Sequence, residues 1–289
     1  MTINCLTYNT SWATQANIIA GSEANFVEAC QKQYKKGGKQ CSSNALKKLK
    51  KLDKLDLVCL QEVNSDIEIQ LMKSHTHLKK FKRGKVGLSS VSTLWNPEVF
   101  GSLVYHDVFN ISNKSDDRPC LVVIFKKNNE YIIVINAHTT CMSMTGTIKE
   151  MKECNIKHNR VKTILGNKLF KNEKINKFIN ENTKIIMMGD FNDSNTVIHK
   201  NSPLTIKYRK KSLKLYHKKT KSQARKTLKS CCWHKPKHKY KYFSDTGDYI
   251  LVNDNVKQQT IFIPEIFRKA GRLNRLYSDH MPVMSKLKL

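Results

Sequence analysis

Short runs of alternating apolar and polar positions recur along the chain, and this period of two predicts a protein rich in β-strands. Residues 3–8 show the alternation clearly. Residues 121–125 and 131–136 are two further runs, joined by Asn128 and Asn129, and this arrangement is typical of a tight β-hairpin. Additional strands are predicted at 56–60, 86–95, 100–109, 185–188, 249–252 and 259–263, and from Met281 onward.

Helical spacing occurs in three segments. The first is predicted to run from Ser22, as its cap, to about Tyr34, and a second starts at Ser42 or Ser43 and passes through LKKLKKL. The stretch KKGGKQ between them is expected to be a loop. A third segment covers 147–182. Because the chain shows no internal repeat and no clear linker, the pattern predicts one mixed α/β domain with antiparallel strand pairs.

Length and hydropathy agree with a globular protein. The chain has 289 residues, 39% of them hydrophobic, so it can bury a sizeable core. It contains no apolar run of about 18 residues, and its first residues lack the basic and apolar regions of a signal peptide. We therefore expect a soluble, unprocessed, monomeric protein inside the cell, in the cytoplasm or the nucleus.

The cysteines point to the same compartment. There are nine, an odd number, without a CxxC pair or a zinc-ligand spacing. Cys5 and Cys59 lie within predicted strands, where cysteine behaves as a small apolar residue. The adjacent Cys231 and Cys232, with His234, are a weak candidate for a metal site. We expect reduced thiols in a reducing compartment.

The formal net charge of +29 suggests an anionic partner, but its composition weakens that inference. The 52 basic residues comprise 44 lysines and only 8 arginines. An AT-rich coding sequence produces this bias by itself, and bidentate contacts to phosphate or guanine favour arginine. Net charge alone therefore says little about the partner.

The distribution of charge says more. No acidic residue occurs between Asp193 and Asp245, whereas lysine, arginine and aromatic residues recur there. We expect a basic insertion at about 199–242 that binds nucleic acid through phosphate contacts and base stacking. An anionic membrane surface is an alternative partner, and a solvated insertion without a partner is another. The candidate nucleic-acid-binding residues are Lys210, Lys211, Lys218, Lys219, Trp233 and Tyr240.

Each of six predicted strands carries an acid, an amide or an imidazole at one end. In chain order these residues are Asn9, Glu62, His138, Asp190 with Asn192, Asp248, and Asp279 with His280. One such residue is usually a cap, a turn or a surface residue. Six in succession indicate a shared site, because loops have no reason to place these types repeatedly at strand ends.

The motifs around these residues, TYN, LQEV, NAH, GDFN, GDYI and SDH, resemble in order those of the endonuclease/exonuclease/phosphatase superfamily, also called DNase I-like. They span nearly the whole chain. The resemblance implies an α/β (α+β) fold in four layers, with two mixed β-sheets packed face to face and helices outside, over residues 1–289. It also implies metal-dependent cleavage of phosphate esters, usually with Mg²⁺ and with Mn²⁺ as a second option.

The metal would be held by oxygen ligands. Glu62 offers the hard carboxylate oxygens that Mg²⁺ prefers. Asn9 and Asp279 are candidates for additional or water-mediated ligands. The number of metal ions stays open.

The remaining motif residues have roles that hydrolysis of a phosphodiester requires. The resemblance makes Asp190 the base that takes a proton from the attacking water. Asn192 would donate its amide to the nucleophile or to a phosphoryl oxygen. His280, oriented by Asp248, would stabilise the pentacovalent phosphorus. His138 would contact the phosphate or protonate the leaving oxygen.

Two details bear on the subfamily. His138 in NAH is unlike the tyrosine-containing segment of the abasic-site endonucleases and closer to DNase I, deadenylases, sphingomyelinases, inositol 5-phosphatases and tyrosyl-DNA phosphodiesterases. The lack of a signal peptide counts against a secreted enzyme.

Arg118 precedes a predicted strand, and we interpret it as a charged strand start rather than as a substrate contact.

Three functions remain. The first is a phosphodiesterase that acts as a nuclease or processes nucleic-acid ends, and the second acts instead on a phosphoinositide or another phospholipid headgroup. The third is a non-catalytic nucleic-acid-binding module, which the presence of every motif residue disfavours. No protein partner is inferred from the sequence.

Overall fold

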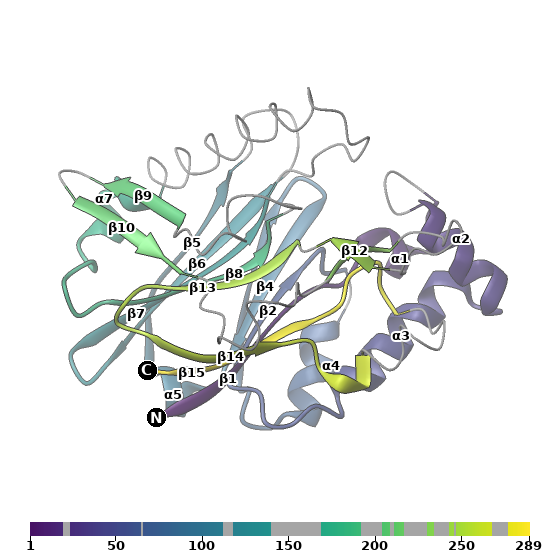
Figure 1. Ribbon diagram of the computed structural model, residues 1–289, viewed down its shortest axis with the longest axis horizontal. Coiled ribbons are helices and arrows are strands. Elements are labelled where there is room, and N and C mark those ends of the chain that lie inside the picture. The colour runs from purple at the N-terminus through teal and green to yellow at the C-terminus, as the bar shows by residue number, and fades with distance from the viewer. Residues whose placement is uncertain are drawn as a thin grey trace.

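The structure is a computed structural model in which two β-sheets pack against each other (Figure 1). It describes residues 1–19, 24–64, 66–111, 118–139, 169–191, 204–208, 211–216, 230–233, 243–245, 247–267 and 277–289.

The first sheet has six strands in the order β14-β15-β1-β2-β4-β3. In that order they are Lys257–Phe262, Val283–Lys288, Thr2–Asn9, Leu57–Gln61, Ser89–Trp95 and Lys80–Val86. The neighbours β1 and β2 run parallel, and all other pairs are antiparallel. Both central strands therefore end on the same side of the sheet.

The second sheet has five strands in the order β13-β8-β7-β6-β5. In that order they are Asp248–Val252, Lys184–Asp190, Glu130–His138, Pro119–Lys127 and Ser102–Asn110. Here β7 and β8 form the parallel pair. The predicted hairpin joins β6 to β7, and Asn128 and Asn129 both have positive φ, as a tight hairpin turn of type I′ requires.

The core between the sheets follows from the alternation of side chains along each strand. In β1, Ile3 and Cys5 face the second sheet, whereas Leu6 and Tyr8 face the helices on the other side. Buried residues from β2, β4, β6, β7, β8, β13, β14 and β15 complete the layer between the sheets. Both sheets thus have two apolar faces, which is why so many of their strands are apolar throughout.

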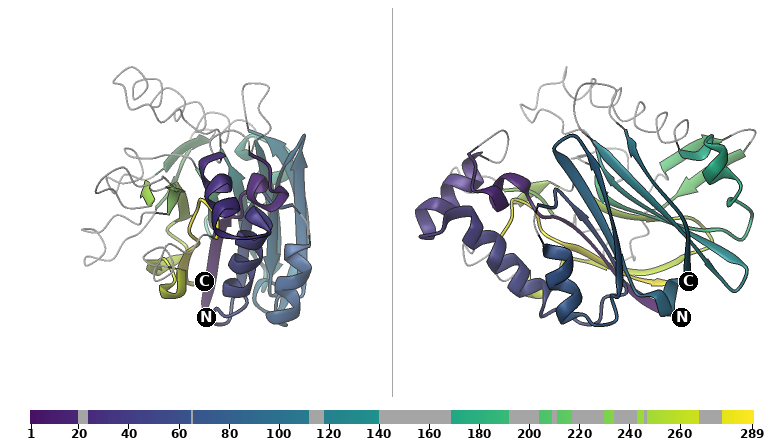
Figure 2. Two further views of the ribbon diagram at one scale, coloured as in Figure 1. Left: turned by 90° about the vertical axis from the view of Figure 1, so that its right-hand side faces the viewer. Right: turned by 180° about the vertical axis from the view of Figure 1, so that it is seen from behind.

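Helices cover the outer faces. The six-stranded sheet packs against α3 (Gly37–Leu49) and α4 (Ile67–Ser74), and α1 (Trp12–Ala16) and α2 (Ala24–Gln33) lie beside them (Figure 2). Residues 169–179, with the short α7 (Glu173–Asn176), pack on the outer face of the five-stranded sheet. A single turn, α5 (Pro97–Phe100), leads into β5. The predicted four-layer sandwich is confirmed.

The start of α3 differs from the sequence prediction. The stretch KKGGKQ is not a loop, because Gly37 and Gly38 are the first residues of the helix, and Ser42 and Ser43 lie inside it. A Cβ on Gly38 would lie 2.4 Å from the carbonyl oxygen of Thr14, so the glycine allows α3 to approach α1 closely. Capping propensity alone misplaced the helix start because it ignores this tertiary contact.

The predicted basic insertion is described only in part. The hairpin of β9 (Leu204–Tyr208) and β10 (Lys211–Leu215) is followed by Tyr216, which exchanges two backbone hydrogen bonds with Val252 in β13. Two shorter strands, β11 (Cys231–Trp233) and β12 (Phe243–Asp245), pair with each other. The insertion is therefore attached to the five-stranded sheet. The predicted helix at 147–182 is described only from residue 169 onward.

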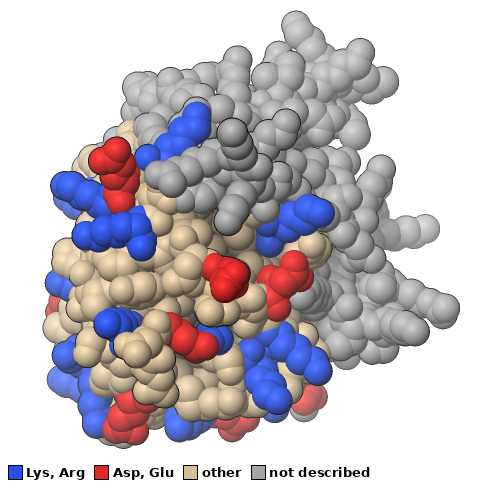
Figure 3. All heavy atoms as spheres, turned by 90° about the vertical axis from the view of Figure 1, so that its left-hand side faces the viewer, with Lys and Arg blue, Asp and Glu red and all other residues tan. Residues whose placement is uncertain are grey.

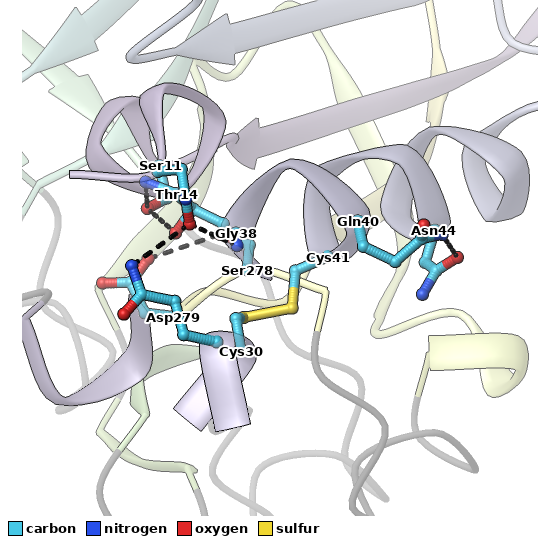
Figure 4. Close-up of a disulfide and its surroundings, with 11 residues drawn as sticks. Ser11, Thr14, Cys30, Gly38, Gln40, Cys41, Asn44, Ser278 and Asp279 are labelled. Atoms are coloured by element: carbon cyan, nitrogen blue, oxygen red, sulfur yellow. Dashed lines mark hydrogen bonds between the residues drawn. A yellow bond between two sulfur atoms is a disulfide. The ribbon is translucent and has the colours of Figure 1, made fainter. Parts of the chain in front are cut away.

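A disulfide joins Cys30 in α2 to Cys41 in α3 (Figure 4). This pair contradicts the expectation of reduced thiols. The sequence did not reveal it, because two cysteines 11 residues apart form no recognisable disulfide pattern. A disulfide is more typical of an oxidising compartment, so the pair does not support the reducing compartment predicted above. Cys5, Cys59 and Cys120 are free and buried. Among the described residues, no helix is long and apolar enough to cross a membrane.

Candidate active site

The residues predicted at the six strand ends meet at one end of the sandwich. Asn9 ends β1, Glu62 follows β2, His138 ends β7, Asp190 ends β8, Asp248 begins β13, and Asp279 with His280 precedes β15. The two parallel pairs bring four strand ends together, and the antiparallel β13 and β15 begin there. In the five-stranded sheet, Asp190 pairs with His138 on one side and with Asp248 on the other.

Asn9 links the two sheets at this point. Its Nδ2 donates one hydrogen bond to Glu62 Oε1 and another to Asp190 Oδ2, both at 3.0 Å. Its Oδ1 accepts a hydrogen bond from the backbone N–H of Ser11 at 2.9 Å, which fixes the orientation of the amide. Asn9 therefore presents its nitrogen to both carboxylates and holds them in place. In this orientation the amide nitrogen supports the carboxylates, and Oδ1 remains the only atom of the side chain that could bind a metal.

Glu62 lies on the other side of Asn9 with a constrained backbone and a fixed carboxylate. Its φ is +55°, a left-handed conformation that non-glycine residues rarely adopt and that often occurs at functional sites. Its Oε2 accepts a hydrogen bond from the backbone N–H of Trp12 at 2.9 Å, at the start of α1. The carboxylate is thus held from two directions while the residue stays partly exposed.

Asp190 is fully buried between the sheets' ends, and the glycine before it allows this position. Gly189 has φ of +152°, and a Cβ there would lie 1.9 Å from the carbonyl oxygen of Ala137 in the neighbouring strand. No larger residue fits without a separation of β7 from β8. The GD of the GDFN motif therefore has a steric reason: the glycine permits the close approach that positions the aspartate.

His280 and Asp248 form a buried pair beside Asp190. The Nδ1 of His280 donates to Asp248 Oδ2 at 3.0 Å, and its Nε2 faces Asp190 Oδ2 at 3.6 Å and Asp279 Oδ2 at 3.9 Å. Burial disfavours the imidazolium, but the three carboxylates outweigh it and raise the pKa of His280 well above its usual value. The ring is therefore cationic near neutral pH and points its Nε2–H toward the carboxylates of Asp190 and Asp279.

His138 approaches from the opposite side. Its Nε2 lies 3.5 Å from Glu62 Oε1 and 3.8 Å from Asp190 Oδ2, and its Nδ1 is 3.4 Å from Ser89 Oγ. Burial lowers the pKa of His138 despite these carboxylates, so the ring is neutral near pH 7. Two histidines in one site thus have opposite shifts, which is a common sign of divided acid–base roles.

Two carboxyl groups of the site are also shifted. Burial raises the pKa of Asp190, although the nearby charge of His280 opposes the rise. Burial likewise raises the pKa of Asp279 to about 6. Deprotonation of either group is unfavourable because several negative charges share a space with little solvent. A bound cation would relieve this cost.

The donor set fits a divalent metal. The negative charge of Glu62 helps to raise the pKa of Asp279, so a cation near the two carboxylates would be favoured. In addition, Asp248 Oδ1 is buried without a hydrogen-bond partner among the described residues. Asp190, Asp248 and His280 also place one ligand atom each within 4.8 Å of one another. In this second group, however, His280 Nδ1 already binds Asp248. Oxygen donors of this kind suit Mg²⁺ or Mn²⁺ better than a soft metal.

Some predicted residues lie outside the described residues or are described only by their backbone. The former are Asn192, Lys210, Lys218, Lys219 and Tyr240, and the latter are Lys211 and Trp233. The structure brings the other predicted site residues together.

Four contacts were not foreseen from the sequence. Ser278 Oγ donates to the backbone oxygen of Asn9 at 3.0 Å, and the N–H of His280 donates to that hydroxyl at 3.2 Å. Ser89 Oγ lies beside the His138 ring, as described above. The charge of Arg118 contributes to the lowered pKa of His138, and its buried Nε has no hydrogen-bond partner among the described residues. Arg118 therefore lies near the site, although its position before a strand was interpreted above as a charged strand start. The SDH motif was the sequence signal for the Ser278 contacts, and no motif indicated Ser89.

Comparisons with known proteins agree on the fold. No protein-family profile matches the sequence, and no curated protein is significantly similar to it. Among solved structures, an endonuclease/exonuclease/phosphatase from Bacteroides vulgatus matches 100% of this chain and 99% of its own, with a TM-score of 0.56 and 14% identity. The chain has the endonuclease/exonuclease/phosphatase fold.

Two further solved structures share this fold. ANGEL2, described as a 2′,3′-cyclic phosphatase, matches 99% of this chain and 95% of its own, with a TM-score of 0.62 and 14% identity. A D. rerio TDP2 humanised by 14 mutations matches 100% and 99%, with a TM-score of 0.57 and 13% identity. At such low identity, the similarity establishes the endonuclease/exonuclease/phosphatase fold alone.

Proposed function

We propose that the chain is a divalent-metal-dependent phosphodiesterase that cleaves nucleic acid or processes its ends. The observation that carries this proposal is the arrangement around Asp190, which accepts a hydrogen bond from Asn9 and faces the cationic His280 at 3.6 Å. Glu62 shares the Asn9 amide with it. In this proposal Asp190 is the base, His280 the cationic donor and Glu62 the carboxylate that would hold the metal, and the three lie in one cluster.

Glu62 would hold the metal, together with Asp279 or water. When bound, the ion would neutralise charge on the phosphate and so favour attack by water. Asn9 contributes by fixing the Glu62 carboxylate, and the backbone N–H of Trp12 does so from the other side. Asp279 remains charged at neutral pH more readily when a cation is nearby, since burial raises its pKa.

Asp190 takes a proton from the attacking water as the new oxygen–phosphorus bond forms. Burial raises the pKa of this carboxyl group, which brings its basicity closer to that needed near neutral pH. The fixed Asn9 amide holds the Oδ2 atom in position. The bond from phosphorus to the leaving oxygen then breaks, and that oxygen requires a proton or equivalent charge neutralisation.

The two histidines bind the phosphate as negative charge develops on it. His280, kept cationic by its carboxylates and oriented through Nδ1 by Asp248, donates Nε2–H to a phosphoryl oxygen as negative charge develops. His138 is neutral, so it binds the phosphate by a hydrogen bond and does not add charge. A neutral imidazole cannot give up its remaining proton, so the leaving oxygen takes its proton from solvent water or from Asp190, which has gained one from the attacking water.

Nucleic acid is the favoured substrate. The basic stretch at 199–242 supports this choice, and the fold neighbours include a D. rerio TDP2 in complex with a single-strand DNA product. A phospholipid headgroup is the competing substrate, since the same chemistry and a basic surface would suit it.

A substrate panel tests the proposal. Purified protein is incubated with duplex DNA, single-stranded DNA, RNA, a 5′-tyrosyl DNA adduct and inositol phosphates, each with Mg²⁺ and with EDTA. We expect Mg²⁺-dependent hydrolysis of a nucleic-acid substrate. Asp190→Asn and Glu62→Gln should lower that rate by about 10²–10⁴-fold. Hydrolysis that persists within about threefold in Asp190→Asn would exclude this residue as the base.

A further inference from the structure

A concave region lies on the helical side of the molecule, outside the cluster described above. It is a cleft of about 680 Å³ formed by the ends of α2 and α3 and by the chain just before the SDH motif. Of the residues that the structure describes, four lysines, two tyrosines and two with amide side chains line it, and none is acidic. The lysines, here called the cleft lysines, are Lys47, Lys48, Lys50 and Lys51.

The sequence of α3 explains why the lysines gather there. Ala45, Leu46 and Leu49 are buried against the six-stranded sheet, so the intervening lysines project from the other side of the helix. Two of them lie in the last helical turn, where a positive charge interacts favourably with the helix dipole. The other two are the C-cap residue Lys50 and Lys51, which follows it.

The cleft lysines are largely free of local charge partners. None of them forms an ion pair with a carboxylate among the described residues, whereas the nearby Lys54 does so with Asp56 at 3.8 Å. Lys50 Nζ makes one hydrogen bond to Gln70 Oε1 at 3.4 Å. Four positive charges therefore surround one depression without an ion pair to any acidic side chain in the described part of the chain.

The cleft adjoins the chain that enters the active site. Tyr277 forms part of its wall and is the residue before Ser278, whose hydroxyl donates to the backbone of Asn9. Tyr277 is buried and packs edge-on against Phe267. Figure 4 shows α3, with Asn44 on it, passing the loop that carries Ser278 and Asp279. The cleft and the active site are therefore joined by consecutive residues of one segment, Tyr277 and Ser278.

Charge on another face is distributed differently. In Figure 3, the described part of the face opposite the helices α1–α3 shows basic and acidic side chains interspersed. The cleft is thus not simply a sample of a uniformly basic surface, although lysine is abundant in the whole chain.

We propose that the cleft binds the phosphodiester backbone of a nucleic-acid strand at nucleotides away from the scissile bond. This inference rests on the proposed function for its choice of ligand. Lysine ammonium groups neutralise phosphates without reading sequence, so the cleft adds affinity and orients the strand. A bilayer fits less well, since it is flat and the exposed large apolar residues among the described ones lie outside the cleft lining.

Two variants of the full chain with the same change in charge test this proposal. The cleft variant carries Lys47→Gln, Lys48→Gln, Lys50→Gln and Lys51→Gln. The control variant carries Lys126→Gln, Lys257→Gln, Lys286→Gln and Lys288→Gln. The control lysines are exposed, and Lys288 pairs with Thr2 at the end of β1 away from Asn9. Circular dichroism and thermal denaturation verify that both variants fold.

Binding is measured in EDTA, without turnover, to labelled single-stranded DNA longer than about 16 nucleotides, at several salt concentrations. For the cleft variant we expect weaker binding and a salt slope smaller by about 0.7 for each lost phosphate contact, about 3 in all. The control variant should bind nearly as wild type does. Hydrolysis of a small phosphodiester reporter with Mg²⁺ should be unchanged in both variants.

Each outcome has a distinct meaning. An equal loss in both variants, or unchanged DNA affinity in the cleft variant, overturns the cleft proposal. Lost binding to vesicles of anionic phospholipid with unchanged DNA binding overturns it in favour of a membrane. An inactive wild type in the reporter assay instead contradicts the proposed function, and the binding measurement in EDTA still decides about the cleft.

Discussion

The imidazole of His280 donates Nδ1–H to the buried carboxylate of Asp248 at 3.0 Å, and this contact directs its other nitrogen toward Asp190. If Asp248 acts only through His280, the two residues form one functional unit. Losses caused by their substitution should then overlap rather than add.

The first prediction concerns this pair. Asp248→Asn and His280→Ala should each lower kcat, and the double variant should be barely slower than His280→Ala alone. The measurement is kcat for the best panel substrate in all four proteins. Losses that add fully in log rate would show that Asp248 has a separate role. Asp248→Asn should also shift the pH profile of kcat, since the carboxylate helps to raise the pKa of His280.

The second prediction concerns Asn9. Asn9→Asp would place a third carboxylate 3.0 Å from two others, so the metal-free protein should lose about 1–3 kcal/mol of unfolding free energy at pH 7. Mg²⁺ should restore more stability to this variant than to wild type. Thermal denaturation with EDTA and with Mg²⁺ measures both effects. Asn182→Asp, at an exposed position, is the matched control and should change neither value.

The third prediction concerns the glycine before the base. Gly189→Ala should destabilise the protein by about 3 kcal/mol or more, because the added methyl group would strike the Ala137 carbonyl and the residue has positive φ. Gly87→Ala is the control, because Gly87 also has positive φ but lies in an exposed turn and should cost only about 1 kcal/mol. Urea denaturation measures both variants. Similar costs would show that backbone conformation, not the close strand approach, requires Gly189.

The fourth prediction concerns pH. Folding raises the pKa of Asp279 from an ordinary 3.8 to about 6, so between these values the folded protein binds more protons than the unfolded chain. Stability of the metal-free protein should therefore fall as the pH rises from about 4 to 6, by up to about 3 kcal/mol from this group. Asp279→Asn should remove that part of the slope. Urea denaturation in EDTA across this range measures it, and equal slopes in both proteins would contradict the raised pKa.

The strands were predictable because their pattern is local. In β1, Ile3 and Cys5 face one buried side of the sheet and Leu6 and Tyr8 face the other. The Asn128–Asn129 turn likewise determines the hairpin of β6 and β7. The more polar β3 was missed, because exposed lysines along this edge strand hide the alternation that identifies its neighbour β4. The helix start at Gly37 was missed because its cause lies in another helix.

The site was predictable in its membership but not in its geometry. Strand ends identified Asn9, Glu62 and Asp190, yet nothing in the sequence indicates that the Asn9 amide presents nitrogen to both carboxylates. That orientation depends on the N–H of Ser11, which has an unusual backbone conformation. Likewise, the opposite pKa shifts of the two histidines depend on burial and on neighbours from other strands.

The division of the cluster between the sheets has a mechanical consequence. Asn9, Glu62 and His280 belong to the six-stranded sheet or its connections, whereas His138, Asp190 and Asp248 belong to the five-stranded one. A small slip of one sheet over the other would separate the reacting groups before any strand unpairs. Heat or pressure should therefore abolish turnover ahead of global unfolding. Conversely, any ligand that binds residues of both sheets should stabilise the packing of one sheet on the other.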